Sequence, residues 1–225
     1  MHIEPGLVAE GKLWLSVATA AGAGAYTLKL AWDDIKQRGP LSLLARAALA
    51  TALVFCFFEV FPHYPVGVSE VHFIFGSTLF LILGAAPAAF GLALGLLIQG
   101  VFLAPFDLPQ YGMNVTTLLV PLFALTYIAG KIIKPETPYV DLKYSQALAL
   151  STSYQAGIVA WVMFWALWGQ GFTADNVQSI VTFGGAYMLV ILIEPIADLA
   201  VLAIAKLING LRGSGLVGHR LYHTG

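Results

Sequence analysis

Residues 83–91, LGAAPAAFG, interrupt a stretch from Val71 to Ala104 that contains no Asp, Glu, Lys or Arg. As one continuous helix, these 34 residues would be about 51 Å long at a rise of about 1.5 Å per residue. Gly84 and Pro87 are residue types that end or interrupt helices, so they predict a hairpin between two antiparallel segments. The stretch is therefore expected to form two segments instead of one.

The composition is typical of a protein embedded in a lipid bilayer. Hydrophobic residues make up 59% of the 225 residues and charged residues only 10%, with a mean hydropathy of +0.82, which excludes a soluble class. Eleven Lys and Arg against twelve Asp and Glu provide no basic surface for nucleic acid. The single cysteine, Cys56, excludes a disulfide framework.

The predicted fold is an all-α, polytopic membrane bundle, with residues 1–225 as one transmembrane domain. A helix of about 20 residues crosses the hydrocarbon core of a bilayer. About seven such segments are expected, near residues 13–31, 42–61, 71–84, 86–104, 115–132, 145–168 and 177–205.

Positive charge predicts the orientation, because Lys and Arg accumulate on the cytoplasmic side of membrane proteins. With seven spans and the N-terminus outside, only Lys12 lies outside. The C-terminus is then cytoplasmic and the protein is expected in the plasma (inner) membrane. The other ten lie at the cytoplasmic side: Lys29, Lys36, Arg38, Arg46, Lys131, Lys134, Lys143, Lys206, Arg212 and Arg220.

The chain start has the donors of a metal chelate. The acidic opening lacks a basic signal-peptide region, so the first residues are expected to be retained. The Met1 amine, the His2 amide nitrogen and the His2 ring Nδ1 can close a five- and a six-membered ring around one ion. Planar nitrogen donors suit Ni(II), Cu(II) or Co(II) better than Zn(II). The alternative is that His2 is an ordinary surface histidine.

Further polar residues are predicted to surround this chelate on the external face. His72 follows a Pro/Gly loop, and an ionisable residue at the mouth of a membrane helix often marks a site; a capping or interfacial histidine is the alternative. His63 is a second candidate, although its neighbours favour an interfacial belt. Gln99 and Asn114 could orient metal ligands or connect helices by hydrogen bonds.

Two acidic residues interrupt the last apolar segment. Glu194 and Asp198 share one helix face on either side of Pro195, and could pair with positive side chains of another helix or belong to a proton relay. No metalloprotease, serine-hydrolase or Walker motif is present in the sequence. The chain is therefore not expected to be an enzyme, and any ATP hydrolysis that drives transport would occur on a separate subunit.

These residues, in this order, resemble the CbiM/NikM family, the substrate-capturing membrane subunits of energy-coupling factor transporters for cobalt and nickel. The resemblance covers residues 1–8 and about 67–120 and rests on four elements: Met1-His2-Ile3 with Gly6, His72 leading to Leu83 and Gly84, Gln99, and Gly112-Met113-Asn114. In that family the metal is held by the terminal amine, the second residue and a later histidine. The resemblance implies Met1, His2 and His72 as ligands.

The resemblance also implies the function and the partners. The chain would bind Co²⁺, or as second choice Ni²⁺, as transported substrate, in a pocket that includes Ser69, Gln99 and Asn114, and no resident cofactor is expected. Its partners would be a transmembrane coupling (T) subunit, cytoplasmic ATPase subunits and a small auxiliary membrane subunit, with no nucleic acid. A small-residue face in the first span, Ala18, Ala21, Gly22 and Ala25, could contact the coupling subunit or pack internally.

Two other functions remain open at the level of sequence. The same scaffold could carry an organic micronutrient such as a vitamin, with Tyr64, Phe73, Phe106 and Tyr111 as an aromatic lid. The chain could also be a membrane assembly factor or an intramembrane enzyme without a transport role. The first alternative predicts that blocking the N-terminal amine leaves substrate binding intact, and the second that turnover needs no ATPase partner.

Overall fold

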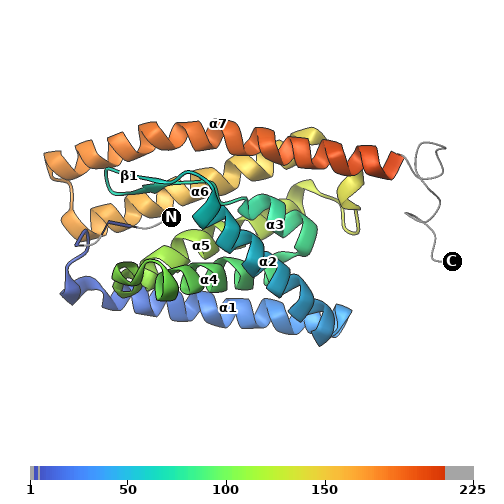
Figure 1. The fold of residues 1–225 in the computed structure, drawn as a ribbon, viewed down its shortest axis with the longest axis horizontal. Coiled ribbons are helices and arrows are strands. Elements are labelled where there is room, and N and C mark those ends of the chain that lie inside the picture. Colours follow the sequence, from blue (N-terminus) through green and yellow to red (C-terminus); the bar gives the residue numbers. More distant parts are fainter. Residues whose placement is uncertain (1–2, 5, 211–225) are drawn as a thin grey trace.

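The computed structural model describes residues 3–4 and 6–210, which form an elongated helical bundle (Figure 1). The α-helices of this part are α1 (Trp14–Arg38), α2 (Pro40–Val60), α3 (Gly76–Leu83), α4 (Ala85–Phe102), α5 (Tyr111–Ile132), α6 (Tyr144–Gln170) and α7 (Ala174–Gly210). Three short 3-10 helices, Glu10–Lys12, Pro105–Gln110 and Tyr139–Asp141, lie in connections. A hairpin of β1 (Tyr64–Val66) and β2 (Ser69–Val71) joins α2 to α3.

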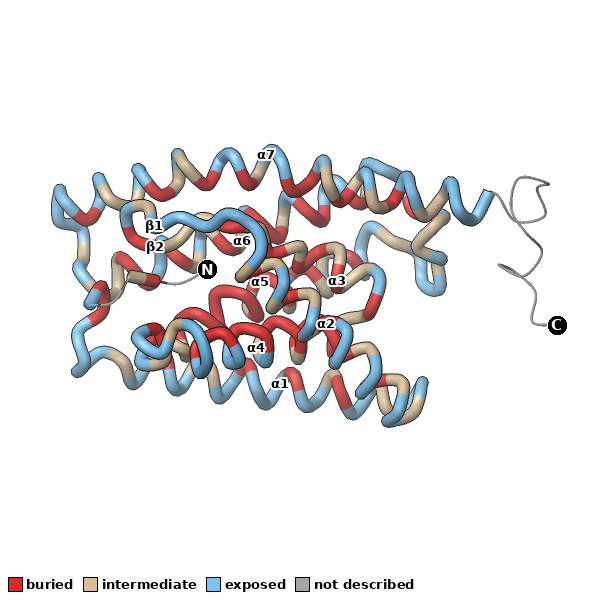
Figure 2. The backbone as a smooth tube through the Cα atoms, in the orientation of Figure 1, coloured by how far each residue is buried: buried red, intermediate tan, exposed pale blue. Residues whose placement is uncertain are grey.

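α1 and α7 lie along the long axis of the molecule on opposite faces, with α4, α5 and α6 between them, whereas α2 runs obliquely across the bundle (Figure 1). Buried residues line the inward side of each helix, whereas the outward sides of α1 and α7 are largely exposed (Figure 2). The exposed side chains include many large apolar residues, such as Trp14, Leu28, Leu41, Leu189 and Ile196. A core packed this way, inside an apolar outer surface, is the arrangement that a lipid environment requires.

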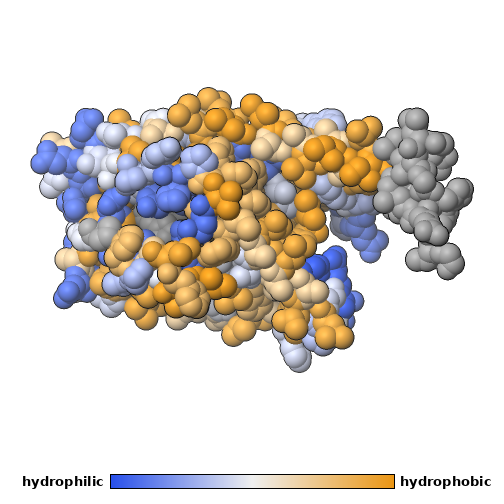
Figure 3. Space-filling model, viewed as in Figure 1, coloured by the Kyte–Doolittle hydropathy of each residue, from blue (hydrophilic) through white to orange (hydrophobic). Residues whose placement is uncertain are grey.

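The expectation of an all-helical membrane bundle is confirmed. Within the described residues, five helices are long and apolar enough to cross a membrane: α2, α4, α6, α7, and α5 together with the 3-10 turn before it. Apolar residues cover the middle of the molecule, and hydrophilic residues gather toward its two ends (Figure 3). α1 has 25 residues, about 38 Å at about 1.5 Å per residue, which is also long enough to cross.

The expected span at 71–84 is not a helix of membrane length. β2 ends at Val71, residues 72–75 are not helical, and α3 contains only eight residues, or about 12 Å of helix. The predicted break is confirmed, because Gly84, with φ +98°, separates α3 from α4. Residues 72–83 therefore pass through the bundle as an extended segment followed by a short helix.

Three other expected boundaries are displaced. α1 ends at Arg38 instead of near 31, and α5 begins at Tyr111 instead of near 115, so Asn114 lies inside its first turn. α7 continues through Gly210 and has 37 residues, about 56 Å, so it is longer than a hydrocarbon core. These differences arise because the expected bounds followed the apolar runs alone, whereas the helices continue into the polar residues that flank those runs.

Lysines at the helix ends lie over aromatic rings in the way expected of membrane interfaces. Lys36, Lys131 and Lys206 lie over the rings of Trp32, Tyr127 and Tyr144. Lys12 lies over Trp168 at the opposite end, near the chain start. This distribution agrees with the predicted orientation, which stays a prediction; Arg212 and Arg220 lie outside the described residues.

The helices α2 and α4 pack closely because α4 presents glycines to α2. A Cβ on Gly91 would lie 2.8 Å from the backbone carbonyl carbon of Ala50, and one on Gly95 would lie 2.6 Å from Val54 Cγ1. Glycines four residues apart let two membrane helices approach to backbone contact. This contact supports the two helices that precede and follow the 61–84 segment.

Substituting Gly91 by alanine is expected to destabilise the bundle by about 1–3 kcal/mol, because the added methyl group overlaps Ala50. Thermal melting in detergent should show a decrease of several degrees. The matched control is Gly24→Ala on α1, where a Cβ would meet no atom within 4 Å. Equal changes of melting temperature in the two variants would contradict this account of the α2–α4 contact.

Candidate metal centre

The chain enters the bundle at Ile3. The Ile3 N–H donates to Asn114 Oδ1 at 2.8 Å, and Ile3 forms an antiparallel β-bridge with Ser69. The Glu4 N–H donates to the Val68 carbonyl at 3.2 Å. Ile3 has no exposed surface, so the segment is an interior part of the fold, beside β2.

The following residues keep this entry in place. Leu7 and Val8 are buried, and the Leu7 carbonyl contacts Gly169 at the end of α6, where any Cβ would overlap it. Lys12 Nζ donates to the carbonyls of Trp168 and Gly169 at 2.9 and 3.1 Å. A cation at the C-terminal end of a helix satisfies carbonyls that have no partner within the helix. The N-terminal segment therefore folds into the bundle from Ile3 onward.

Asn114 is positioned for this contact by the start of α5. The helix begins at Tyr111, whose hydroxyl donates to the Ala93 carbonyl of α4 at 2.9 Å. Gly112 packs on α1, where a Cβ would lie 2.8 Å from the Ser16 carbonyl oxygen. Asn114 is only 1% exposed, and its hydrogen bond goes to the chain start instead of to another helix; a role in orienting metal ligands stays a prediction.

His72 lies in the bundle but not at a helix start, contrary to the sequence-based expectation. It belongs to the extended segment between β2 and α3 and is 2% exposed. Its ring packs edge-on against Phe58 of α2, with centroids 4.7 Å apart. Its Nδ1 lies 3.3 Å from the Phe73 carbonyl oxygen. Ser69, which pairs with Ile3, precedes His72 by three residues and is also buried.

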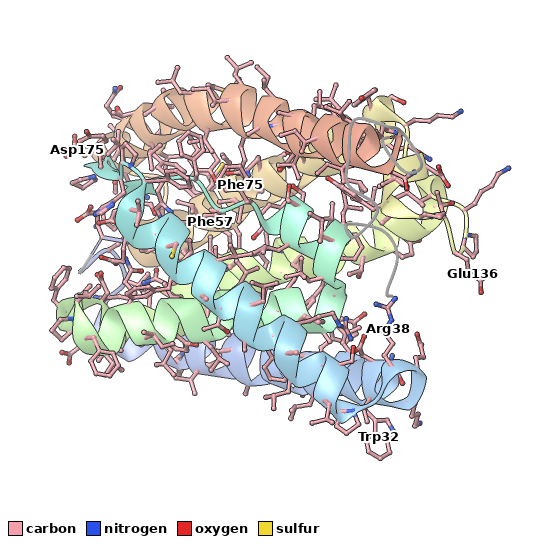
Figure 4. All side chains as sticks on the ribbon, turned by 45° about the vertical axis from the view of Figure 1, so that its right-hand side comes forward. Trp32, Arg38, Phe57, Phe75, Glu136 and Asp175 are labelled. Atoms are coloured by element: carbon pink, nitrogen blue, oxygen red, sulfur yellow. The ribbon has the colours of Figure 1, made fainter. Side chains whose placement is uncertain are left out.

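The end of the extended segment has an unusual backbone. Phe75 has φ +55°, a left-handed conformation that is unfavourable for a bulky residue. Figure 4 shows Phe75 beside Phe57 of α2, with ring centroids 4.9 Å apart. The next residue must be small, because a Cβ on Gly76 would overlap the Tyr154 ring.

Two acidic side chains of α7 hold this region, a role that the sequence did not reveal: Glu194 holds the irregular segment, and Asp198 holds the start of α3. Glu194 accepts the N–H groups of Ile74 and Phe75, each at 2.8 Å. Asp198, one turn along α7, accepts the hydroxyls of Ser77, at 2.6 Å, and Thr78. Non-helical backbone at membrane depth needs such internal partners. The donors are backbone and hydroxyl groups, so the expected pairing with positive side chains is wrong for these contacts.

The remaining expected residues are divided between interior and surface. Gln99 is buried in the last turn of α4, 5% exposed, whereas His63 is exposed. Tyr64 and Phe106, expected in an aromatic lid, are 66% and 65% exposed. A polar recess of about 380 Å³, lined by residues such as Glu4, Gly67 and Gln170, lies beside the chain start and does not include His72.

Acidic side chains surround the chain start. The pKa of Glu4 is raised from its ordinary value of 4.5, first by burial and then by the carboxylates of Glu70 and Asp107. Like charges that raise one another's pKa also create a negative potential that attracts cations. The negative potential around Glu4, Glu70 and Asp107 therefore favours the approach of a divalent cation to the chain start.

The described residues do not contain a complete metal site of ordinary side-chain ligands. Among residues 3–4 and 6–210, no group of three or more His, Cys, Asp or Glu could hold a metal ion. Met1 and His2, two of the three expected ligands, lie outside the described residues. A site at His72 would need donors from elsewhere, such as nitrogen atoms of the chain start.

Comparisons with known proteins agree with this architecture. Residues 2–209 match a family model described as "Cobalt uptake substrate-specific transmembrane region", CbiM. A comparison with curated protein sequences finds no match.

Two solved structures share the fold. One, titled "Crystal Structure of an transition metal transporter", has a TM-score of 0.65 and 17% identity and covers 99% of this chain and 100% of its own. The other, "Crystal Structure of an Truncated Transition metal Transporter", has a TM-score of 0.61 and 18% identity, covering 94% and 97%.

Proposed function

Because this multi-pass membrane protein belongs to the CbiM family, we propose that it captures a divalent transition metal outside the cell for import, with Co²⁺ as first choice and Ni²⁺ as second. Residues 1–225 would act as one transmembrane domain. The family assignment and the bundle support a transport role, and the printed titles of the two structural neighbours name transition metal transporters. The metal is the substrate of transport.

The observation that carries the proposal is the direction of the chain at Ile3. Ile3 pairs with Ser69 and Glu4 with Val68, in antiparallel order. A chain that continues this direction before Ile3 runs alongside β2 toward His72. Consecutive Cα atoms are about 3.8 Å apart, so two residues can bring the terminal amine to the region of the His72 ring.

This geometry supports the proposed ligand set. The Met1 amine, the His2 amide nitrogen and the His2 ring would supply three nitrogen donors, and His72 would supply a fourth. Four nitrogen donors in one plane favour Ni(II), Cu(II) and Co(II) over Zn(II). Ser69 and Asn114 would hold the chain start in place through Ile3, and Gln99 would border the pocket.

The energy for uptake would come from partner subunits of an energy-coupling factor transporter. The chain itself would not be an enzyme, and ATP hydrolysis would occur on cytoplasmic ATPase subunits linked through a transmembrane coupling subunit, with a small auxiliary membrane subunit as a further partner. The small-residue face of α1, formed by Ala18, Ala21, Gly22 and Ala25, is exposed in the structure. It is therefore available to a partner helix and does not pack internally.

Metal analysis of the purified protein tests the proposal. Protein with its native start is expected to retain about one equivalent of Co²⁺ or Ni²⁺ in detergent, whereas protein with extra residues before Met1 should retain little, because its first amine is displaced. An extension at the C-terminus, beyond Gly225, is the matched control and should load like the native protein. Equal loading with and without the N-terminal extension would reject the proposed ligand set.

A further inference from the structure

One peptide group connects the proposed metal ligand His72 with the buried carboxylate Glu194. Its carbonyl, on Phe73, lies 3.3 Å from His72 Nδ1. Its N–H, on Ile74, donates to Glu194 Oε2 at 2.8 Å. A peptide group is planar and rigid, so fixing its N–H also fixes the direction of its carbonyl.

The carbonyl side determines which nitrogen of the His72 ring carries the proton. A carbonyl oxygen is only an acceptor, so its contact with Nδ1 requires a proton on Nδ1. In a neutral imidazole the other nitrogen, Nε2, then has the lone pair that can bind a metal. Metal-binding histidines commonly have this arrangement, in which a backbone carbonyl accepts the other ring N–H and raises the basicity of the ligand.

The Glu194 side chain is itself held in place by further hydrogen bonds. Glu194 has no exposed surface, and its second oxygen accepts both the Phe75 N–H at 2.8 Å and the side-chain amide of Gln155. The Tyr187 hydroxyl donates to Gln155 Oε1 at 2.6 Å. Hydrogen bonds in such a chain polarise one another in a low-dielectric interior. Glu194 therefore fixes the Ile74 N–H, and with it the direction of the Phe73 carbonyl in the same peptide group.

We propose that Glu194 is a positioning residue for the metal ligand: through the Phe73–Ile74 peptide it keeps the His72 proton on Nδ1 and presents Nε2 to the metal. This inference rests on the proposed function for the role of His72, but its structural part concerns the metal-free protein. Glu194 does not touch the metal. Its two hydrogen bonds to the backbone, at Ile74 and Phe75, fix the carbonyl that accepts from the His72 ring, and through that carbonyl the orientation of the ring.

Nitrogen-15 NMR of the histidine rings in the metal-free, detergent-solubilised protein tests the structural part. The His72 signal is assigned by its absence in His72→Ala, and in the native protein it should show the proton on Nδ1. In Glu194→Gln the signal should shift toward a mixture of the two tautomers. A native His72 with its proton on Nε2 would overturn the proposal, whether or not the variant folds.

The matched control is Asp198→Asn, the same exchange of carboxylate for amide one helical turn away. Asp198 accepts from Ser77 and Thr78, on the other side of Gly76 from His72, so the His72 tautomer should stay as in the native protein. Thermal melting separates a local effect from loss of the fold. A tautomer shift of equal size in both variants would overturn the proposal, because it would then reflect general loosening of the segment.

Equilibrium dialysis with Co²⁺ or Ni²⁺ tests the functional part. Glu194→Gln is expected to bind about tenfold more weakly than the native protein, as is typical when the partner of a metal-binding histidine is removed, whereas Asp198→Asn should bind within about threefold of it. Absence of metal binding by the native protein would reject the proposed function, with the tautomer result standing separately. Native binding together with unchanged affinity and tautomer in Glu194→Gln would reject this inference alone.

Discussion

Substituting His72 by alanine is expected to lower the affinity of the purified protein for Co²⁺ or Ni²⁺ by about 10²- to 10³-fold. Four-ligand zinc sites of zinc-finger peptides bind with about 10–16 kcal/mol, so one ligand contributes about 2.5–4 kcal/mol, and about 1.4 kcal/mol corresponds to a factor of ten. Equilibrium dialysis of metal against the detergent-purified protein measures the change.

The matched control for this substitution is His63→Ala. His63 lies in the same connection between α2 and α3, but its side chain is exposed, so its loss should leave metal affinity unchanged. Because His72 also packs against Phe58, the melting temperature of His72→Ala must be measured beside its affinity. A folded His72→Ala protein that binds metal as tightly as the native protein would show that the site lies elsewhere.

The sequence predicted the parts of the fold that depend on local chemistry. Gly84 and the nearby Pro87 were sufficient to predict the break before α4, because glycine can adopt the positive φ found at Gly84 and proline is tolerated only in the first turn of a helix. The segment before Gly84 was wrongly expected to be a membrane-spanning helix. A short apolar run is compatible with a helix or with a buried extended segment, and hydropathy does not distinguish them.

The hydrogen bonds that hold residues 72–75 could not be predicted from the sequence, for a different reason. Glu194 is 120 residues from Ile74, whose N–H it accepts, and a backbone N–H leaves no signature in the sequence. The acidic residue was recognised as unusual in an apolar helix, but its partner was sought among positive side chains. The left-handed backbone at Phe75 was equally invisible, since glycine is the residue type that normally indicates it.

Asn114 shows how far a residue-based prediction could reach. Its position at the outer end of a span indicated a hydrogen-bonding role, and in the structure its side chain accepts one hydrogen bond, from the chain start. The partner, the Ile3 N–H, is 111 residues away in the sequence, and Ile3 is held beside α5 by its β-bridge to Ser69. The same bond connects α5 to the chain start, so it has a consequence for metal binding that can be measured.

Substituting Asn114 by leucine is expected to weaken metal binding by about 30- to 100-fold while the bundle stays folded. Leucine has a similar size but cannot accept the Ile3 N–H, and a buried N–H without a partner costs about 1–3 kcal/mol. In the metal-free variant the Ile3 N–H can donate to water if the chain start leaves the bundle. Metal binding must then bring the segment back, so the cost appears as lost affinity.

Two measurements separate this effect from general destabilisation. Thr117→Val is the matched control, because Thr117 is fully buried on the same helix and its hydroxyl donates only within α5, to the Met113 carbonyl at 2.8 Å; its metal affinity should equal that of the native protein. Limited aminopeptidase digestion of metal-free protein should remove the first residues faster from Asn114→Leu than from the native protein or from Thr117→Val. Native affinity in Asn114→Leu would mean that the Ile3 contact does not hold the metal-binding start in place.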